Sequence, residues 1–247
     1  MNERYARQIL MEQIDVAGQE RLARAAVVVV GAGGLGSPAL TYLAAAGVGR
    51  IGLIDGDTVE LTNLNRQFLH GEADLGRPKA DSARERLAAL NGTIEVRTHD
   101  VRLTEENAAA LLAGYDLILG AVDSFETRAV INRAAIGLGI PYIDGGVNGF
   151  SGSVFYSYPP DLPCLNCVFP LERSKGKTAG VLGTTAGVIG TAMANVALLH
   201  LLGLENPLCN KLFWYDGLRM RTDLIEVRRD EGCLVCGSDS AARRGLK

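Results

Sequence analysis

The chain has 247 residues, with 25 Lys and Arg residues against 28 Asp and Glu residues and a formal net charge of −3. Its composition, 47% hydrophobic and 21% charged, is typical of a soluble globular protein and excludes an intrinsically disordered chain. The slightly acidic balance provides no overall basic surface for a nucleic acid. Neither a nucleic acid nor a membrane is therefore an expected partner.

The first two-thirds of the chain alternates apolar, strand-like segments with helical segments. Strands are expected at 27–30, 51–54, 94–98, 117–121 and 140–143, and helices at 36–47, 78–90, 104–113 and 126–138. Such alternation indicates a doubly wound, Rossmann-like α/β fold with a mostly parallel sheet.

The composition changes after Asp144, where Gly, Ser, Tyr and Pro become frequent. Alternating residues at 153–158 indicate antiparallel strands that extend the sheet, and further strands are expected at 211–216 and 222–228. No linker-like break separates this part from the first. We therefore expect 1–247 to form a single domain, with a first half at about 3–144, a second half at about 145–237 and a polar tail at 238–247.

The segment 178–204 has 27 residues and no formal charge, so it is long enough to span a bilayer. It also contains five glycines, four threonines, Asn195 and His200, which weaken its hydropathy as a membrane span. A buried helix in a soluble core is the better interpretation.

A glycine-rich turn joins the first expected strand to the helix that follows. The pattern is G-x-G-x-x-G at Gly31, Gly33 and Gly36, with Gly34 inside it, and Asp55 ends the next strand. Glycines let a nucleotide approach the backbone, a helix N-terminus attracts phosphate, and the acid can reach a ribose hydroxyl. The motif alone leaves a nucleotide-linked oxidoreductase open. However, no tyrosine has a lysine four residues later, which disfavours the short-chain dehydrogenase type.

Polar and cationic residues follow the second strand in an unusual density. They include Asp57, Asn63, Asn65, Arg66 and, further on, Lys79. A dehydrogenase has little use for Arg66 and Lys79 beside its phosphate turn. Cleavage of a triphosphate, by contrast, spreads negative charge that cations stabilise. The alternative is a solvated loop whose charges form surface pairs.

Asp123 follows the strand expected at 117–121, at the same edge of the sheet. A carboxylate there can hold Mg²⁺ against phosphates. Its alternative role is a helix N-cap, because Glu126 follows three positions later, and the two roles are compatible.

Four of the five cysteines form two C-x-x-C pairs, Cys164 with Cys167 and Cys233 with Cys236. The start of the chain, MNERYARQIL, is charged and has no apolar leader. A cytoplasmic protein is therefore expected, and a metal is favoured over disulfides. The pairs resemble a four-cysteine zinc site whose halves, 65 residues apart, the fold must bring together. Free or redox-active thiols are the alternative. Cys209 is expected to be a buried or half-buried thiol.

These motifs follow an N-terminal R-Y-A-R-Q-I. Together they resemble the ThiF/MoeB/HesA family of adenylyltransferases, prokaryotic relatives of the ubiquitin-activating enzymes, over about residues 3–237. The resemblance implies a homodimer that uses ATP and Mg²⁺ to adenylate the C-terminal Gly-Gly carboxylate of a small ubiquitin-like sulfur-carrier protein, ThiS- or MoaD-like, with release of pyrophosphate. Such carriers supply sulfur for cofactor biosynthesis, including thiamin and molybdopterin.

The resemblance also implies roles for individual residues. The nucleotide-binding set comprises Gly31, Gly33, Gly34, Gly36, Asp55, Asp57, Asn63, Asn65, Arg66, Lys79, Asp123 and Ser124. The catalytic set comprises Arg7, Arg66, Lys79 and Asp123. Within these sets Asp123 coordinates Mg²⁺, and Arg7 is inserted by the partner subunit toward the phosphates. Cys164, Cys167, Cys233 and Cys236 hold a structural zinc ion (Zn²⁺).

The sequence departs from the family at one place. Some relatives carry a cysteine just before the Thr178-Ala-Gly stretch that links covalently to the carrier, whereas this chain has Ser174-Lys-Gly-Lys177 there. We therefore expect adenylation alone, with sulfur delivered by a separate donor. The loop at about 169–178 is expected to admit the carrier's tail or else to be a solvated surface loop. A non-catalytic, zinc-stabilised binding partner of an activating complex is a further alternative.

Overall fold

The computed structural model describes residues 3–158, 160–169 and 180–237. All but the first residue of the expected loop at 169–178 lies outside the described residues, and so does the expected tail at 238–247.

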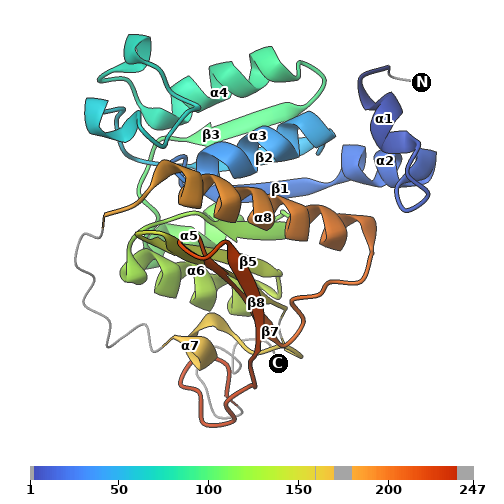
Figure 1. Ribbon diagram of the computed structural model, residues 1–247, viewed down its shortest axis with the longest axis vertical. Coiled ribbons are helices and arrows are strands. Elements are labelled where there is room, and N and C mark those ends of the chain that lie inside the picture. Colours follow the sequence, from blue (N-terminus) through green and yellow to red (C-terminus); the bar gives the residue numbers. More distant parts are fainter. Residues whose placement is uncertain (1–2, 159, 170–179, 238–247) are drawn as a thin grey trace.

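Within the described residues, one eight-stranded sheet is flanked by helices (Figure 1). The strands are β1 (Ala26–Val30), β2 (Arg50–Ile54), β3 (Glu95–His99), β4 (Leu117–Gly120), β5 (Tyr142–Asn148), β6 (Ser151–Ser157), β7 (Lys211–Asp216) and β8 (Arg221–Glu226). Their order across the sheet is β3-β2-β1-β4-β5-β6-β7-β8. The first five strands in this order are parallel, and β6, β7 and β8 extend the sheet in antiparallel fashion. The expected α/β sheet with an antiparallel extension is confirmed.

Helices cover both faces of the sheet. They are α1 (Ala6–Ile9), α2 (Asp15–Arg24), α3 (Gly36–Ala46), α4 (Lys79–Leu90), α5 (Glu105–Leu112), α6 (Phe125–Leu138), α7 (Leu165–Val168) and α8 (Gly183–Leu202), with 3₁₀ turns at Glu3–Tyr5, Leu61–Asn63 and Glu72–Asp74. α3, α4 and α8 pack on one face, and α5 and α6 pack on the other (Figure 1). Val27 and Val29 of β1 point into the core beneath α3, α4 and α8, and Val28 and Val30 point into the core beneath α5 and α6. This double burial explains the uninterrupted valine run of β1.

The strand order reverses at β1, which has β2 on one side and β4 on the other. Connections that leave the carboxyl ends of such strands diverge and open a crevice at the edge of the sheet. The glycine turn follows β1, the segment 55–78 follows β2, and Asp123 follows β4. The topology therefore gathers three separate motifs at one edge.

The strand expected at 140–143 lies differently in the structure. β5 begins at Tyr142 and continues to Asn148, where it pairs with β6. Glycine is disfavoured in strands, so Gly145 concealed this continuation from the sequence. A Cβ at Gly145 would collide with the side chain of Met193 in α8. The glycine is needed because the helix packs directly on the strand.

Within the uncharged segment at 178–204, Gly183–Leu202 form α8, which packs in the core. By length and composition α8 could cross a membrane, but half of its apolar window is buried in the fold. α8 packs against α3, β5 and β6, and Gly190 lies so close to Leu35 and Pro38 that a Cβ would collide with them. A core helix of a globular protein passes the same length and composition test, and this packing confirms the expected buried helix.

Candidate functional site

A pocket of about 370 Å³ opens where segments leave the carboxyl ends of β2, β3 and β4. Its lining consists of Gly56, Asp57, Thr58, Glu60, Asn63, Arg66, Gln67, Lys79, Arg102 and Asp123. Five residues predicted from the sequence to bind the nucleotide therefore meet in one cavity, namely Asp57, Asn63, Arg66, Lys79 and Asp123.

The glycine turn lies beside this pocket. Gly31 has a φ of +99°, and a Cβ there would lie 2.6 Å from the carbonyl oxygen of Ala121, so glycine is required for the turn to close against the end of β4. A Cβ at Gly33 would lie 3.6 Å from Gln67, which lines the pocket. Within the described residues, the N–H groups of Gly33 and Gly34 donate no hydrogen bond. Free N–H groups at the start of α3 form an anion-binding arrangement.

Asp55 ties the glycine turn to the segment after β2. Its Oδ2 accepts the Ala32 N–H at 2.7 Å, and its Oδ1 accepts the Asp57 N–H at 2.9 Å. Burial raises the pKa of Asp55, while the two backbone donors and nearby Lys79 oppose that shift. Because each carboxylate oxygen can accept a second hydrogen bond, Asp55 keeps the capacity to bind a ribose hydroxyl.

Asp57 holds two cations at the pocket. Lys79 Nζ lies 3.3 Å from Asp57 Oδ2, and Arg102 Nη2 lies 3.4 Å from Asp57 Oδ1. The Lys79 side chain is only 8% exposed, whereas that of Arg102 is 82% exposed. A buried ammonium needs a partner or an anionic ligand, so Lys79 is fixed in place while Arg102 can move to meet a ligand.

Arg66 is held by its own loop. Its Nη1 donates to the Thr62 carbonyl oxygen and to Asn65 Oδ1, both at 2.9 Å. Asn63 Oδ1 accepts the Glu60 N–H at 3.1 Å and stabilises the turn that precedes Arg66. Asn65 itself is exposed and does not line the pocket, so the structure connects it to the site through Arg66.

The start of α8 packs on this loop. A Cβ at Gly183 would lie 2.5 Å from the Asn65 carbonyl oxygen, so glycine permits the contact. The C-terminal half of the chain therefore supports the loop that carries Arg66.

Asp123 and Ser124 have separate roles after β4. Asp123 is exposed and lines the pocket. Ser124 is the N-cap of α6, because its Oγ accepts the Thr127 N–H at 3.0 Å. The alternative assignment of Asp123 as the N-cap is therefore wrong. The carboxylate of Asp123 stays available to a ligand because the neighbouring hydroxyl caps the helix.

A buried ion pair stabilises the same segment. Asp144 is 1% exposed, lies 3.5 Å from Arg128 Nη1 and accepts the Tyr142 hydroxyl at 2.7 Å. Burial raises the pKa of Asp144, and Arg128 acts to lower it. Arg128 Nη2 also lies 3.5 Å from the carbonyl oxygen of Val122, the residue before Asp123. Sequence reasoning missed this pair because neither residue belongs to a motif.

Arg102 and Gln67 are pocket residues to which sequence reasoning gave no role. Arg102 follows β3 as Asp123 follows β4, so the same argument about strand ends could have identified it. Gln67 is 5% exposed, and its Oε1 has no hydrogen-bond partner within the described residues. The pocket therefore contains a buried acceptor that a bound ligand could satisfy.

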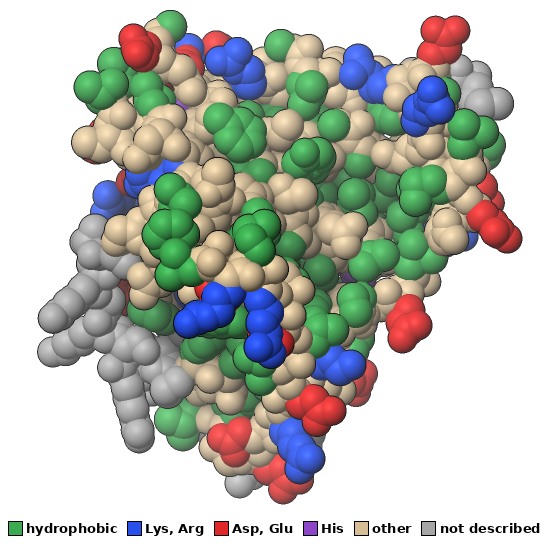
Figure 2. All heavy atoms as spheres, in the orientation of Figure 1, with side chains coloured by type: hydrophobic (Ala, Val, Ile, Leu, Met, Phe, Trp, Pro, Cys, Tyr) green, Lys and Arg blue, Asp and Glu red, His purple; other side chains and the backbone are tan. Residues whose placement is uncertain are grey.

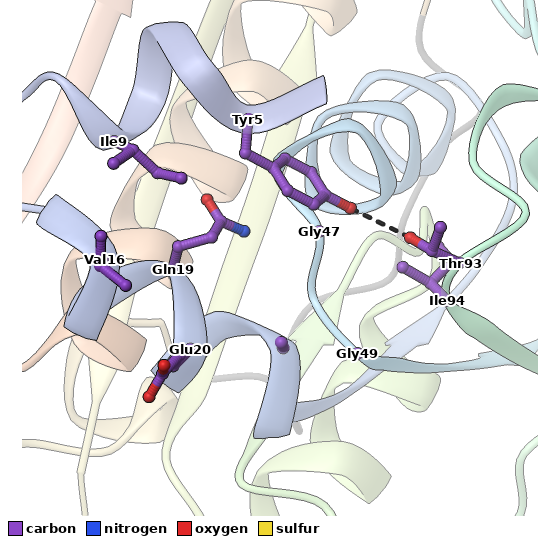
Figure 3. A pocket seen from close by; sticks show the side chains of 10 residues that line it. Tyr5, Ile9, Val16, Gln19, Glu20, Gly47, Gly49, Thr93 and Ile94 are labelled. Atoms are coloured by element: carbon purple, nitrogen blue, oxygen red, sulfur yellow. Dashed lines mark hydrogen bonds between the residues drawn. The ribbon is translucent and has the colours of Figure 1, made fainter. Parts of the chain in front are cut away.

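Arg7 lies on α1, which precedes β1, whereas the residues that line the pocket follow β2, β3 and β4. In Figure 1, α1 lies at the end of the sheet opposite to the segments that follow these strands. Tyr5 and Ile9, near Arg7 in the sequence, line a second hollow, of about 390 Å³, beside segments that precede β2 and β3 (Figure 3). In its own chain Arg7 does not line the nucleotide pocket.

The second hollow differs from the pocket in the chemistry of its lining. Its lining is mainly apolar and contains none of the residues predicted to bind a nucleotide. Its polar side chains are paired, because Tyr5 lies within hydrogen-bonding distance of Thr93 (Figure 3) and Gln19 Nε2 donates to the Ala46 carbonyl oxygen. The pocket at the carboxyl ends of the strands is therefore the better candidate site.

The four paired cysteines converge beside α7. The Sγ atoms of Cys164, Cys167, Cys233 and Cys236 all lie within 4.8 Å of one another, and three of the separations are 3.4, 3.7 and 3.9 Å. Tetrahedral zinc with Zn–S bonds of about 2.3 Å requires S–S separations of about 3.8 Å. The cluster could therefore hold a metal ion, and its donor set fits zinc.

Cys209 lies outside this cluster and is exposed. The expectation of a buried or half-buried thiol is therefore wrong. Cys209 follows the 206–208 turn at the surface, and the adjacent Leu208 is the residue that is buried.

Comparison with known proteins gives the site a context. Residues 5–235 match the ThiF family. The chain is 45% identical, over 98% of its length, to the sulfur carrier protein adenylyltransferase of Thermus thermophilus, of which it covers 93%. It is 42% identical to the probable adenylyltransferase/sulfurtransferase MoeZ of Mycobacterium tuberculosis over 92% of its length, and it spans 60% of MoeZ.

The fold of the chain also matches solved structures. A crystal structure of Escherichia coli MccB with ATP matches with a TM-score of 0.83 and 25% sequence identity, over 95% of this chain and 75% of that one. The family match and the 45% identical relative together cover nearly all of the chain. The chain belongs to the ThiF family.

Proposed function

We propose that the protein uses ATP to adenylate the C-terminal Gly-Gly carboxylate of a small ubiquitin-like sulfur-carrier protein, with release of pyrophosphate. The observation that carries the proposal is the convergence of Arg66, Lys79 and Asp123 on one pocket beside free N–H groups of the glycine turn. The 45% identity to a sulfur carrier protein adenylyltransferase supports the same reaction.

ATP would lie across the glycine turn and the pocket. Gly31 and Gly36 shape the turn, the N–H groups of Gly33 and Gly34 donate to the α-phosphate, and Asp55 accepts a ribose hydroxyl. Asn63, Arg66 and Lys79 contact the phosphates, Asn65 acts through Arg66, Asp57 orients Lys79, and Ser124 borders the site next to Asp123. The unpartnered Oε1 of Gln67 and the unused N–H groups fit such a ligand.

The charge of the pocket explains a need for Mg²⁺. Three cationic side chains, Arg66, Lys79 and Arg102, are balanced by three acids, Asp57, Glu60 and Asp123. Such a lining does not by itself offset the charge of a triphosphate. We assign Asp123 as the Mg²⁺ ligand, and the bound ion would supply charge neutralisation at the phosphate oxygens.

The chemistry needs no general base from this chain. A C-terminal carboxyl group has a pKa of about 3.5 and is already ionised at neutral pH. Its oxygen attacks the α-phosphorus, the bond to the bridging β-phosphate oxygen breaks, and pyrophosphate leaves. The glycine-turn N–H groups stabilise the α-phosphate oxygens, while Arg66 and Lys79 stabilise the leaving pyrophosphate.

A homodimer would complete the site. α1, which carries Arg7, and the start of α8, which packs on the loop of Arg66, lie toward opposite ends of the layer formed by α3 and α8 (Figure 1). This layer exposes apolar side chains, including Tyr42 of α3 and Val188 of α8, and Figure 2 shows hydrophobic side chains over it. A two-fold axis lying in this face and running across the strands would bring α1 of one protomer over the pocket of the other. Arg7 of the partner subunit could then reach the phosphates.

The remaining assignments concern the second half of the chain. We assign zinc to the four-cysteine cluster in a structural role, because the ion would join the α7 segment to the segment that follows β8. We assign carrier binding and dimer contacts to residues 145–237 and nucleotide binding to residues 3–144, within a single domain. The protein would act in the cytoplasm with a separate sulfur donor, since the segment before Thr178 has no cysteine.

ATP–pyrophosphate exchange tests the proposal. Purified protein is incubated with ThiS-like and MoaD-like carriers, each beside a copy that lacks its last glycine. Exchange that requires one intact carrier supports the reaction and identifies the pathway. Absence of exchange with folded, metal-loaded protein would favour the non-catalytic alternative, and reduction of bound NAD(P)⁺ would favour the oxidoreductase.

A further inference from the structure

A buried histidine lies directly behind the glycine turn. His70 is 5% exposed, and its Nε2 lies 3.0 Å from the carbonyl oxygen of Ala32. Its Nδ1 lies 2.9 Å from Ser82 Oγ, and Ser82 is a buried residue in the first turns of α4. His70 therefore joins the turn after β1 to the helix that begins at Lys79.

The partners of His70 determine its tautomer. A carbonyl oxygen can only accept, so Nε2 must carry the proton that is donated to Ala32. In the neutral imidazole, Nδ1 is then an acceptor, and its hydrogen-bond partner is Ser82, whose hydroxyl also interacts with the Asp74 carboxylate. Burial lowers the pKa of His70, and the charged groups that act on it are Lys79, Asp55 and Asp74. The neutral Nε2–H form follows from this geometry.

The contact fixes a peptide plane of the turn. The carbonyl of Ala32 and the N–H of Gly33 belong to one planar trans peptide, in which the two groups point in opposite directions. Because His70 binds the carbonyl, the Gly33 N–H is directed away from His70. The preceding peptide is fixed as well, since the Ala32 N–H donates to Asp55 Oδ2 at 2.7 Å. Ala32 is thus clamped on both sides, at a position with no exposed surface.

We propose that His70 is a positioning residue for the nucleotide: held as the Nε2–H tautomer by the Ala32 carbonyl and anchored through Nδ1 by Ser82, it orients the Ala32–Gly33 peptide so that the Gly33 N–H faces the bound phosphate. This inference deepens the proposed function and rests on it only for the identity of the ligand. His70 touches no substrate itself. A rigid, correctly directed donor lowers the free-energy cost of ordering the glycine turn when the anion binds.

Two substitutions of His70 separate positioning from packing. His70→Gln retains an N–H donor that can reach the position of Nε2, so it should bind ATP with a Kd within about twofold of wild type. His70→Leu removes the donor and leaves the Ala32 carbonyl unpaired, so its Kd for ATP should rise about tenfold. Thermal denaturation of each variant checks that it is folded.

Ser82→Ala tests the anchoring of the ring without changing the imidazole. Loss of the hydroxyl removes the hydrogen bond at Nδ1 that anchors the ring against the Ala32 carbonyl, so the Kd for ATP should rise several-fold. Ser157→Ala, which also deletes a buried hydroxyl but lies in β6, is the matched control and should bind ATP as wild type does. If His70→Leu does not fold, Ser82→Ala decides whether His70 positions the turn for ATP.

The tautomer can be observed directly, because the chain has three histidines. Long-range ¹H–¹⁵N correlation spectra of the ¹⁵N-labelled protein, assigned with His70→Gln, should show a neutral Nε2–H imidazole for His70 at pH 7.5. An Nδ1–H tautomer, or equal ATP affinity in His70→Leu, His70→Gln and wild type, would overturn the inference. Both readouts omit the carrier. Normal ATP binding without adenylation would therefore count against the proposed function and leave this inference standing.

Discussion

Lys79 Nζ lies 3.3 Å from Asp57 Oδ2, and the lysine side chain is 8% exposed while the aspartate is 54% exposed. The cation is thus enclosed and the anion is open to solvent. This asymmetry holds the ammonium at the wall of the pocket while leaving Asp57 free to exchange partners. A phosphate that enters the pocket meets a cation whose position is already fixed.

Lys79→Met should remove this cation while keeping most of the buried stem. We expect kcat/KM for ATP to fall about 100-fold, corresponding to about 2.7 kcal/mol of lost transition-state stabilisation. The KM for the carrier should change little. Lys211→Met, in β7 and outside the pocket, is the control and should keep the wild-type kcat/KM for ATP. Unchanged kinetics in Lys79→Met would contradict the assigned role.

Asp123 and Ser124 allow a test of adjacent residues with different roles. Asp123→Ala should abolish adenylation, because the proposed Mg²⁺ ligand is lost, and should leave the zinc content and the dimer intact. Ser124→Ala should keep most of the activity but lower the free energy of unfolding by about 1 kcal/mol, because the α6 N-cap is lost. The measurements are single-turnover adenylation and urea denaturation. Retained adenylation in Asp123→Ala would refute the Mg²⁺ assignment.

The dimer hypothesis predicts complementation between inactive variants. Arg7→Ala and Asp123→Ala should each be inactive alone, since each removes one component of every site. After subunit exchange in an equal mixture, half of the dimers are mixed, and one of the two sites in each mixed dimer is intact. Activity should therefore recover to about a quarter of wild type. No recovery, despite subunit exchange shown by mass spectrometry, would mean that Arg7 does not act across the interface.

The four-cysteine cluster should bind one zinc ion per chain. Cys233→Ser should lose the metal and lower Tm, because the segment after β8 is no longer joined to the α7 segment. Cys209→Ser should retain both the metal and Tm, because Cys209 is exposed and lies outside the cluster. Metal analysis and thermal unfolding measure these outcomes. Full zinc content in Cys233→Ser would contradict the assignment.

Burial of His70 predicts a pH dependence of stability. The pKa of His70 is lowered in the folded state, so the unfolded chain takes up the proton first as the pH falls below about 6.5. The free energy of unfolding should therefore decrease between pH 7.5 and 5.5. The decrease should be smaller in His70→Gln, which removes this group but keeps His200, whose pKa is also lowered by burial. Equal decreases in urea unfolding would show that His70 does not contribute.

Much of the fold could be predicted because its signals are local. The valines of β1, the glycine turn and the strand-end acid Asp55 lie within or directly beside the elements they specify. Residues that follow parallel strands meet at one edge of the sheet, so the pocket containing Arg66, Lys79 and Asp123 could be expected from strand order alone.

The remaining features depend on contacts between distant segments. The continuation of β5 through Gly145 is visible only when Met193 of α8 is placed against it. The Arg128–Asp144 pair and the contact of His70 with Ala32 join residues that share no motif. The sequence leaves Asp123 open as an alternative N-cap because Asp123 and Ser124 are both good capping residues, and only the backbone geometry selects Ser124.

The most direct test of the central claim is ATP–pyrophosphate exchange with a carrier and with the same carrier lacking its last glycine. Adenylation of the carrier's terminal carboxylate predicts exchange that requires ATP, Mg²⁺ and the intact Gly-Gly terminus, and that is lost in Asp123→Ala. Exchange that persists without the terminal glycine, or that is absent with every carrier while the protein is dimeric and loaded with zinc, would contradict it.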